Sequence, residues 1–129
     1  MIGRMHHLIL DAPDPARLAD FYSTLFGLPI TYQDDDFAVV SVDSTTSGVA
    51  FQRVSDRPPS TWPGDGPLLI HMDVMVDDVD VAADRLIALG ARVLRRTEGI
   101  CVLADPAGHP FCLIPRPHWA PPVADSDDQ

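Results

Sequence analysis

The sequence predicts an α+β fold built from two β-α-β-β-β modules. Residues 7–25 match residues 71–89 at a shift of 64, and Gly27 matches Gly90 after a one-residue slip. Later in each half, Phe51 matches Phe111 at a shift of 60. A stretch rich in Pro, Gly and Ser, residues 55–67, separates the matching parts and has the composition of a linker. Because repeats of this kind are copies of one folding unit, we expect a duplicated module.

The repeat sets the expected domain boundaries. We expect the first module at 1–54, a linker at 55–67, the second module at 68–115 and a loose C-terminal tail at 116–129, where Pro and Asp are frequent. Each module has an apolar sheet face under its helix, so the other faces of two curved sheets would enclose a cleft.

Alternating and helical periodicities place the elements. Asp14, which matches Asp78 in the repeat, is expected to cap the first helix, and Gly27 to end it. The helices are predicted at 15–26 and 79–89. The strands are predicted at 5–11, 30–33, 37–42 and 49–54, and again at 68–76, 92–96, 99–104 and 110–114.

Charge narrows the range of partners. The net charge is −10, and all nine basic residues are arginine. Without a basic patch the chain is not expected to bind nucleic acid, and an anionic membrane surface would repel it. A cationic small molecule would be favoured. No signal peptide or membrane-spanning run is evident, which predicts a cytoplasmic protein, and two cysteines do not make a disulfide framework.

Strand alternation selects the residues that line the expected cleft. Phe51 and Phe111 would pack under the helices, which turns Gln52 and Cys112 toward the cleft. The repeat therefore places four polar side chains around one cavity: His7, Gln52, His71 and Cys112. The other residues expected to face the cleft are Ile9, Asp11, Asp73 and Met75.

Each of these residues has more than one interpretation. The two histidines either bind a metal or are hydrogen-bonded cleft residues. Cys112 is either a ligand or a small buried hydrophobe. Cys101 would lie opposite Cys112 in a regular hairpin, which makes a redox pair conceivable. His109 is expected to be exposed in its turn.

Three further residues have expected roles in chemistry or binding. Asp11 and Asp73 are the carboxylates that alternation directs into the cleft, so they are candidate catalytic bases. Trp62 in the linker could stack on a flat ligand at the cleft mouth, beside Ile9 and Met75. Trp62 could equally cover apolar surface.

Three motifs in this order resemble the vicinal oxygen chelate superfamily, which includes glyoxalase I, bleomycin-resistance proteins and extradiol dioxygenases. The resemblance covers residues 5–116 and lies closest to the glyoxalase-like branch. The motifs are HLILDAPDPARLADFYSTLFGL from His7, HMDVMVDD from His71 with its helix to Leu89-Gly-Ala, and DPAGHPFCLI from Asp105.

The resemblance implies a metal site on the first and last strands of each module. His7 and His71 match the histidine positions of metal-using relatives, whereas Gln52 and Cys112 stand where glutamates are expected. With a thiolate, the set resembles a soft zinc site with a weak fourth ligand. Because the second carboxylate often serves as the base in the family, its absence at Cys112 argues against glyoxalase I activity proper.

Two functions follow as expectations. The first is a lyase, isomerase or oxygenase that uses a divalent metal (zinc, iron, nickel or manganese) on a small molecule with adjacent oxygens. The second is a metal-free protein of the bleomycin-resistance kind that sequesters a cationic or aromatic drug. The resemblance also implies a homodimer.

Overall fold

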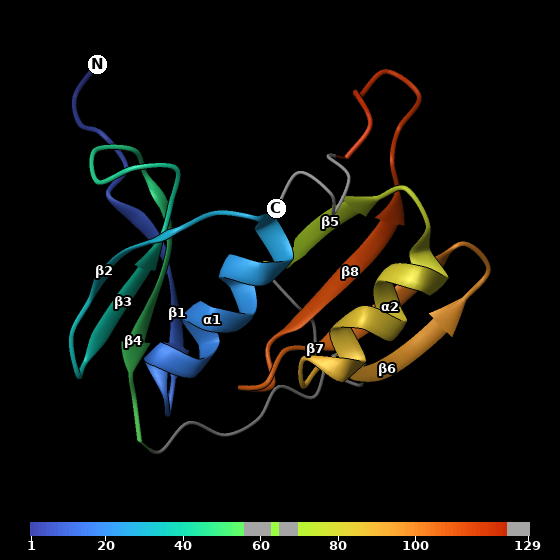
Figure 1. The fold of residues 1–129 in the computed structure, drawn as a ribbon, viewed down its shortest axis with the longest axis horizontal. Helices are drawn as coiled ribbons and strands as arrows, with labels where there is room; N and C mark the ends of the chain where they lie inside the picture. Colours follow the sequence, from blue (N-terminus) through green and yellow to red (C-terminus); the bar gives the residue numbers. More distant parts are fainter. Residues whose placement is uncertain (56–62, 65–69, 124–129) are drawn as a thin grey trace. The chain divides into compact units, whose positions relative to one another are not determined.

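A computed structural model describes residues 1–55, 63–64 and 70–123. The chain divides into two compact units, Met1–Pro58 and Pro59–Gln129. Within the described residues, each unit contains a four-stranded sheet and one helix (Figure 1). The predicted α+β fold of two β-α-β-β-β modules is therefore confirmed. The cleft predicted between the modules stays a prediction.

In the first module, the first and last strands lie side by side and run parallel. The sheet order is β1-β4-β3-β2, and the other two pairings are antiparallel. Its elements are β1 (His7–Ala12), α1 (Pro15–Phe26), β2 (Ile30–Gln33), β3 (Phe37–Val40) and β4 (Gly48–Arg53).

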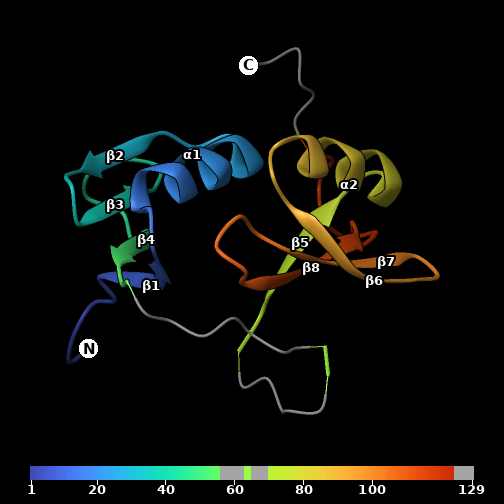
Figure 2. The ribbon, with the colours of Figure 1, turned by 90° about the horizontal axis from the view of Figure 1, so that it is seen from below.

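The second module repeats this topology. The order is β5-β8-β7-β6, and the first and last strands of the module, β5 and β8, again run parallel. Helix α2 lies over one face of the sheet (Figure 2). Its elements are β5 (Met72–Val76), α2 (Val79–Ala88), β6 (Arg92–Thr97), β7 (Ile100–Ala104) and β8 (Pro110–Pro115).

Helix α1 forms where the sequence predicts it. The Asp14 side chain accepts a hydrogen bond from the Arg17 backbone N–H at 3.3 Å, and Gly27 ends the helix with φ at 65°, a value that an L side chain rarely adopts. The ring of Tyr22 stacks on that of Phe51 with centroids 5.3 Å apart. This contact fixes the Phe51 side of the sheet as the helix-covered face.

Helix α2 is built in the same way. Asp78 caps it by accepting a hydrogen bond from the Val81 N–H at 3.0 Å. Ala83 and Leu86 are its buried residues. None of the described helices is both long and apolar enough to span a membrane.

A β-bulge occurs at the same place in both modules. The β2–β3 register shifts between Ile30 and Tyr32, and the β6–β7 register shifts between Val93 and Arg95. A bulge adds one residue to one strand of a pair and increases the local twist. Its repetition is structural evidence for the duplication.

The register corrects one expected equivalence between the modules. His7 pairs with Gly48, and Met72 with Phe111. Strand β5 follows β1 by 64 positions in the repeat. These pairings then place β8 at 62 positions after β4, and not at 60 as the sequence match predicts. Leu113, not Phe111, stands at the place of Phe51.

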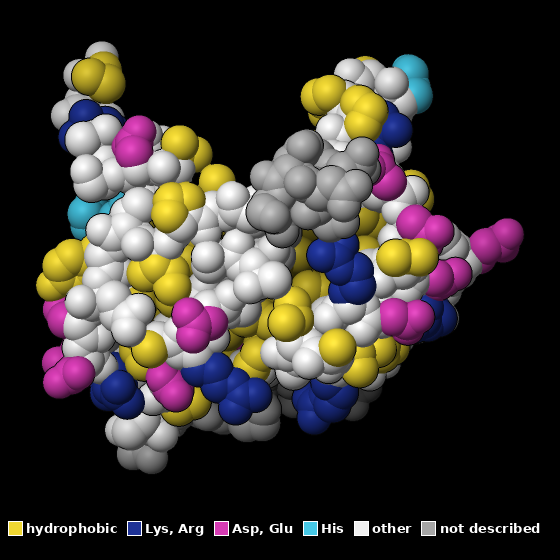
Figure 3. Space-filling model, viewed as in Figure 1, with side chains coloured by type: hydrophobic (Ala, Val, Ile, Leu, Met, Phe, Trp, Pro, Cys, Tyr) yellow, Lys and Arg dark blue, Asp and Glu magenta, His cyan; other side chains and the backbone are white. Residues whose placement is uncertain are grey.

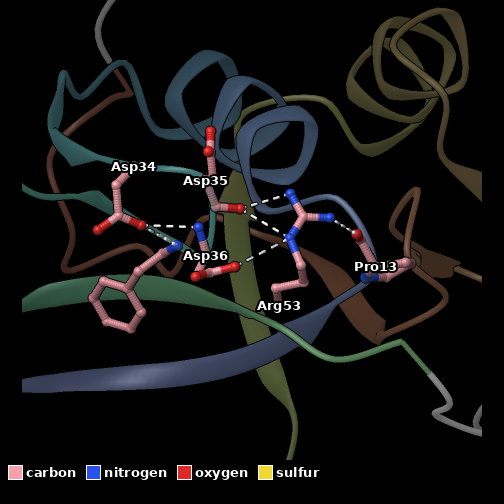
Figure 4. A network of polar contacts seen from close by, with 6 residues as sticks. Pro13, Asp34, Asp35, Asp36 and Arg53 are labelled. Carbon is pink, nitrogen blue, oxygen red and sulfur yellow. Dashed lines mark hydrogen bonds and ion pairs between the residues drawn. The ribbon is translucent and has the colours of Figure 1, made fainter.

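Arg53 joins three segments of the first module (Figure 4). Its Nε and Nη2 donate to the Asp35 carbonyl at 2.9 and 2.6 Å, and Nη1 donates to the Pro13 carbonyl at 2.8 Å. Nε also lies 3.5 Å from Oδ1 of Asp36. The end of β4 is thus tied to the turn after β2 and to the approach to α1.

The tail begins in an ordered way. Arg116 donates to Asp77 Oδ1 at 2.6 Å and to the Ala120 carbonyl at 2.7 Å. Ala120 is buried, while Trp119 is exposed. These contacts tie Arg116 to the second module and to Ala120, and the loose tail expected from residue 116 stays a prediction.

Candidate functional site

Three side chains with metal-binding atoms converge on β5 and β8. Asp73 pairs with Cys112 across the parallel strands, and His71 lies two residues before Asp73, on the same side of the sheet. One ligand atom from each side chain lies within 4.8 Å of the others. His71 Nε2 is 3.2 Å from Asp73 Oδ1. These three residues are called the β5–β8 cluster below.

The cluster combines a buried thiol with exposed partners. Cys112 is 8% exposed, whereas His71 and Asp73 are exposed side chains. Burial raises the pKa of the Cys112 thiol, and the charge of the Asp73 carboxylate beside it raises the pKa further. The thiol is therefore protonated at neutral pH unless a cation stabilises its anion.

The sequence predicts Asp73 as a base and does not predict it as a ligand beside His71. A signal for this arrangement is present, since His71 and Asp73 are separated by one residue and a strand then places them on one face. Strand alternation alone does not predict that Cys112 is the neighbour of Asp73 on β8, because this pairing depends on the β5–β8 register.

His7 stands at the place of His71 in the first module, but its ring is engaged differently. The Gly48 N–H donates to His7 Nδ1 at 3.0 Å. An accepting Nδ1 leaves the proton of the neutral ring on Nε2, so this geometry offers a metal no free nitrogen lone pair. Burial lowers the pKa of His7, and repulsion from His6 lowers it further, which also favours the neutral ring.

Gln52 and His7 lie at opposite ends of their strands. His7 pairs with Gly48, while Gln52 pairs with Asp11. Four residues of strand separate the two places, or about 13 Å at roughly 3.3 Å per residue. Within the first module, the structure thus brings Gln52 to the candidate base Asp11 and not to the histidine.

The first module lacks the other two members of the cluster. By the pairing of its strands, the places of His71, Asp73 and Cys112 are taken there by His7, Ile9 and Ala50. Isoleucine and alanine side chains offer no ligand atom. Among the described residues, the second module therefore carries a chemically complete cluster, and the first module keeps only its histidine.

Cys101 does not lie opposite Cys112. It pairs with Leu113, and Cys112 pairs with Val102, so the two thiols point to opposite faces of the sheet. Both cysteines are free and buried. The hairpin register thus excludes the cross-strand thiol pair that a regular turn predicts.

His109 is not exposed as the sequence predicts. Its side chain is 14% exposed, and its Nδ1 lies 2.8 Å from Oδ2 of Asp105, which is fully buried. Asp105 Oδ1 also accepts from the Ala107 and His109 N–H groups at 2.8 and 3.0 Å. Asp105 therefore holds the turn that joins β7 to β8, next to the strand that carries Cys112.

A shallow hollow lies elsewhere on the second module. It is lined by residues at the start of α2 and in the β6–β7 hairpin, among them Asp78, Arg96 and Gly99. None of the site residues predicted from the sequence lines it. On the face shown, both acidic and arginine side chains are exposed on the second module (Figure 3).

A family described as "Glyoxalase-like domain" matches residues 7–114. The chain belongs to the glyoxalase-like family. This family and its structural neighbours lie in the vicinal oxygen chelate superfamily, as the sequence predicts. A comparison with curated proteins found no match.

Solved structures share the glyoxalase-like fold. A glyoxalase-related enzyme from Fulvimarina pelagi is 19% identical, with a TM-score of 0.66 and coverage of 92% of each chain. A glyoxalase/bleomycin resistance protein/dioxygenase family enzyme from Burkholderia phytofirmans PsJN is 17% identical, with a TM-score of 0.62 and coverage of 86% of this chain and 97% of that one.

A third similar structure is the fosfomycin resistance protein FosX from Mesorhizobium loti. It is 19% identical, with a TM-score of 0.60, and the match covers 92% of this chain and 95% of that one. At these identities the likeness establishes the fold. The chemistry of this glyoxalase-like chain depends on its own residues.

The donor set of this glyoxalase-like chain fits a divalent metal. Imidazole nitrogen, carboxylate oxygen and thiolate sulfur are all zinc ligands. Zinc bonds of about 2.0–2.3 Å in a tetrahedron separate ligand atoms by about 3.3–3.8 Å. The observed limit of 4.8 Å lies about 1 Å beyond that range, a distance that side-chain rotation can close.

The predicted ligand-contacting residues of this glyoxalase-like chain have different outcomes. Ile9 and Met75 are exposed at 40% and 43%, and alternation places them on the faces that carry His7 and Asp73. Trp62 lies outside the described residues. Roles in ligand binding stay predictions for all three.

Proposed function

We propose that this glyoxalase-like chain acts with a divalent metal on a small molecule that carries two adjacent oxygens, as a lyase, isomerase or oxygenase. The observation that carries the proposal is the β5–β8 cluster, in which three ligand atoms lie within 4.8 Å of one another. Support also comes from the family, since a solved neighbour is described as glyoxalase I from Leishmania major, 19% identical with a TM-score of 0.60.

The metal would supply Lewis-acid polarisation of the substrate oxygens and stabilise the anion that forms when a proton is removed. The protein's own groups would orient the substrate and move that proton. Under this proposal Asp73 is a metal ligand of the β5–β8 cluster and not the base. Asp11, an exposed carboxylate that pairs with Gln52 within the first module, keeps its predicted role as a candidate base.

A second function has its own support. A metal-free binding protein of the drug-resistance kind would explain why His7 accepts a hydrogen bond from Gly48. It would also explain why Ile9 and Ala50 stand in the first module at the places of Asp73 and Cys112. The net charge of −10 would favour a cationic drug. FosX, a fosfomycin resistance protein, is among the similar structures. Homodimerisation is proposed on the resemblance alone.

Elemental analysis of tag-free protein, purified without chelator, separates the two functions. We expect close to one zinc, iron, nickel or manganese ion per chain. Asp84→Asn, a change in an exposed carboxylate of α2, serves as the control for general acidity and should leave the metal content unchanged.

The opposite result has a clear meaning. Protein without metal, which also takes up none of these four ions on dialysis, would refute metal-dependent chemistry. The metal-free binding function would then be tested by titrating cationic and aromatic drugs while tryptophan fluorescence is recorded. Metal-loaded protein would instead be screened on dicarbonyl, catechol and epoxide substrates.

A further inference from the structure

We infer that the metal site is complete within the second module, and that it takes a thiophilic cation of the zinc type through His71, Asp73 and Cys112. This inference rests on the proposed function and specifies its ligands. It departs from the arrangement that the resemblance implies, in which both modules supply ligands and the two histidines form a pair.

The geometry of two adjacent strands supports the inference. Asp73 and Cys112 are direct neighbours in the β5–β8 register, so their side chains leave the sheet side by side, about 5 Å apart at the backbone. His71 reaches the same point from two residues earlier, with Nε2 already 3.2 Å from Asp73 Oδ1. No residue outside the module is required to bring the three ligand atoms together.

The chemistry of the donors selects the cation. One nitrogen, one carboxylate oxygen and one sulfur form a borderline-soft set, which suits zinc or cobalt and not magnesium or calcium. Three protein ligands leave a fourth position open, which is the pattern of catalytic zinc sites and not of structural ones. Because His71 and Asp73 are exposed beside the buried Cys112, solvent or a substrate could reach a metal held there.

The first module lacks an equivalent set. Its histidine accepts a hydrogen bond from the Gly48 N–H, and the other two equivalent places hold Ile9 and Ala50. His7→Ala should consequently keep the metal affinity within about twofold of that of the wild type. His71→Ala should lower the affinity at least about tenfold, because changing even a residue that only hydrogen-bonds a metal ligand costs about that much.

Cobalt(II) tests the inference directly, because a thiolate bound to cobalt gives a charge-transfer absorption in the near ultraviolet that nitrogen and oxygen ligands do not. Metal-depleted full-length protein would be titrated with cobalt(II) alone. The variants are His7→Ala, His71→Ala, Asp73→Asn, Cys112→Ser and Cys101→Ser. Circular dichroism and an unfolding curve would establish that each variant is folded before titration.

The inference predicts the charge-transfer band in the wild type, in His7→Ala and in Cys101→Ser, the matched change at a buried cysteine on the opposite sheet face. The band should vanish in Cys112→Ser, and binding should weaken in His71→Ala and Asp73→Asn.

Two results would overturn the inference in different ways. Cobalt that binds without the band, and is lost equally in His7→Ala and His71→Ala, would mean a site shared between the histidines of both modules; the proposed function would stand. Wild-type protein that binds neither cobalt(II) nor zinc(II) would overturn the inference, and the proposed function would fall with it only if iron, nickel and manganese are not taken up either.

Discussion

Asp73 lies directly beside Cys112 in the register of two parallel strands, and its carboxylate contributes to the raised pKa of the thiol. The two groups form an electrostatically unfavourable pair when both are ionised and no cation lies between them. A divalent cation would bind both anions and remove that repulsion. The arrangement has consequences for the metal-free protein that can be measured.

Asp73→Asn should lower the pKa of Cys112 in metal-free protein. Burial is the larger cause of the raised pKa and persists in the variant, so the pKa should fall only part of the way toward that of a free thiol. Thiolate absorbance can be followed during a pH titration in a Cys101→Ser background, in which Cys112 is the only remaining thiol. Asp84→Asn is the control. An unchanged Cys112 titration in Asp73→Asn would contradict the role given to the carboxylate.

The stability of the first module should fall in mild acid because of His7. Its pKa is lowered in the folded protein, by burial and then by His6, so the unfolded chain binds the proton more readily. Stability from this group is therefore fully present above the unfolded pKa of about 6.5 and declines as the pH falls below it. Protonation also removes the bond from the Gly48 N–H, which contributes about 0.5–1.5 kcal/mol.

Urea unfolding between pH 5 and pH 8 measures this dependence. His7→Gln should flatten the curve in that range, because glutamine does not titrate. His6→Gln, which removes the neighbouring charge and keeps His7, should reduce the dependence without abolishing it. A wild-type midpoint that stays constant over the range would count against the prediction.

Gly48→Ala should destabilise the first module. A Cβ at this position would lie 2.1 Å from the Val40 carbonyl oxygen and 2.7 Å from Ser41 Cβ. Because the first of these is backbone inside a sheet, the strand has to move, at a cost of about 1–3 kcal/mol. Gly3→Ala, where nothing lies within 4 Å of the added atom, is the matched control, and thermal unfolding compares the two. Equal melting temperatures would show that the strands accommodate the methyl group.

Asp105→Ala should destabilise the second module by about 1–3 kcal/mol, because its buried carboxylate accepts from two backbone N–H groups and from His109. Asp105→Asn keeps an acceptor oxygen and should cost less. Amide hydrogen exchange should show faster exchange in the β7–β8 turn of Asp105→Ala. An exposed carboxylate at Asp84 changed to Ala gives the comparison, and a loss of the same size there would contradict the prediction.

Local signals were sufficient to predict most of the fold. The caps Asp14 and Asp78 and the terminator Gly27 act within a few residues of themselves, so the helix starts, and the end of α1, lie where the sequence places them. The strand β2 has the predicted bounds Ile30–Gln33. Alternation also assigned Gln52 and Cys112 to the face opposite the helices, since even shifts preserve the face.

Pairing between strands was harder to predict. A shift of 60 aligns Phe51 with Phe111 in sequence, but the structure relates β4 and β8 by 62, and both numbers keep the apolar pattern in place. Likewise, a regular hairpin would pair Cys101 with Cys112, but the observed register pairs Cys101 with Leu113. Register depends on hydrogen bonding between segments distant in sequence, which no single-strand pattern encodes.

The candidate site shows the same division. The histidine positions follow from the repeat, whereas the orientation of His7 depends on one backbone N–H at Gly48. The burial of His109 depends on Asp105, and the neighbour of Asp73 depends on the register. These are tertiary properties, so residue type and spacing could not predict them.

Residues of the β5–β8 cluster come from opposite ends of the second module's sequence, and the parallel pairing of its first and last strands brings them together. During synthesis, β5 would leave the ribosome long before its partner strand. A nascent chain that still lacks β8 has His71 and Asp73 but no sulfur beside them. Under the proposed function, the ion can be captured with full affinity only after the module has closed, which makes metal loading a late event that reports on completed folding.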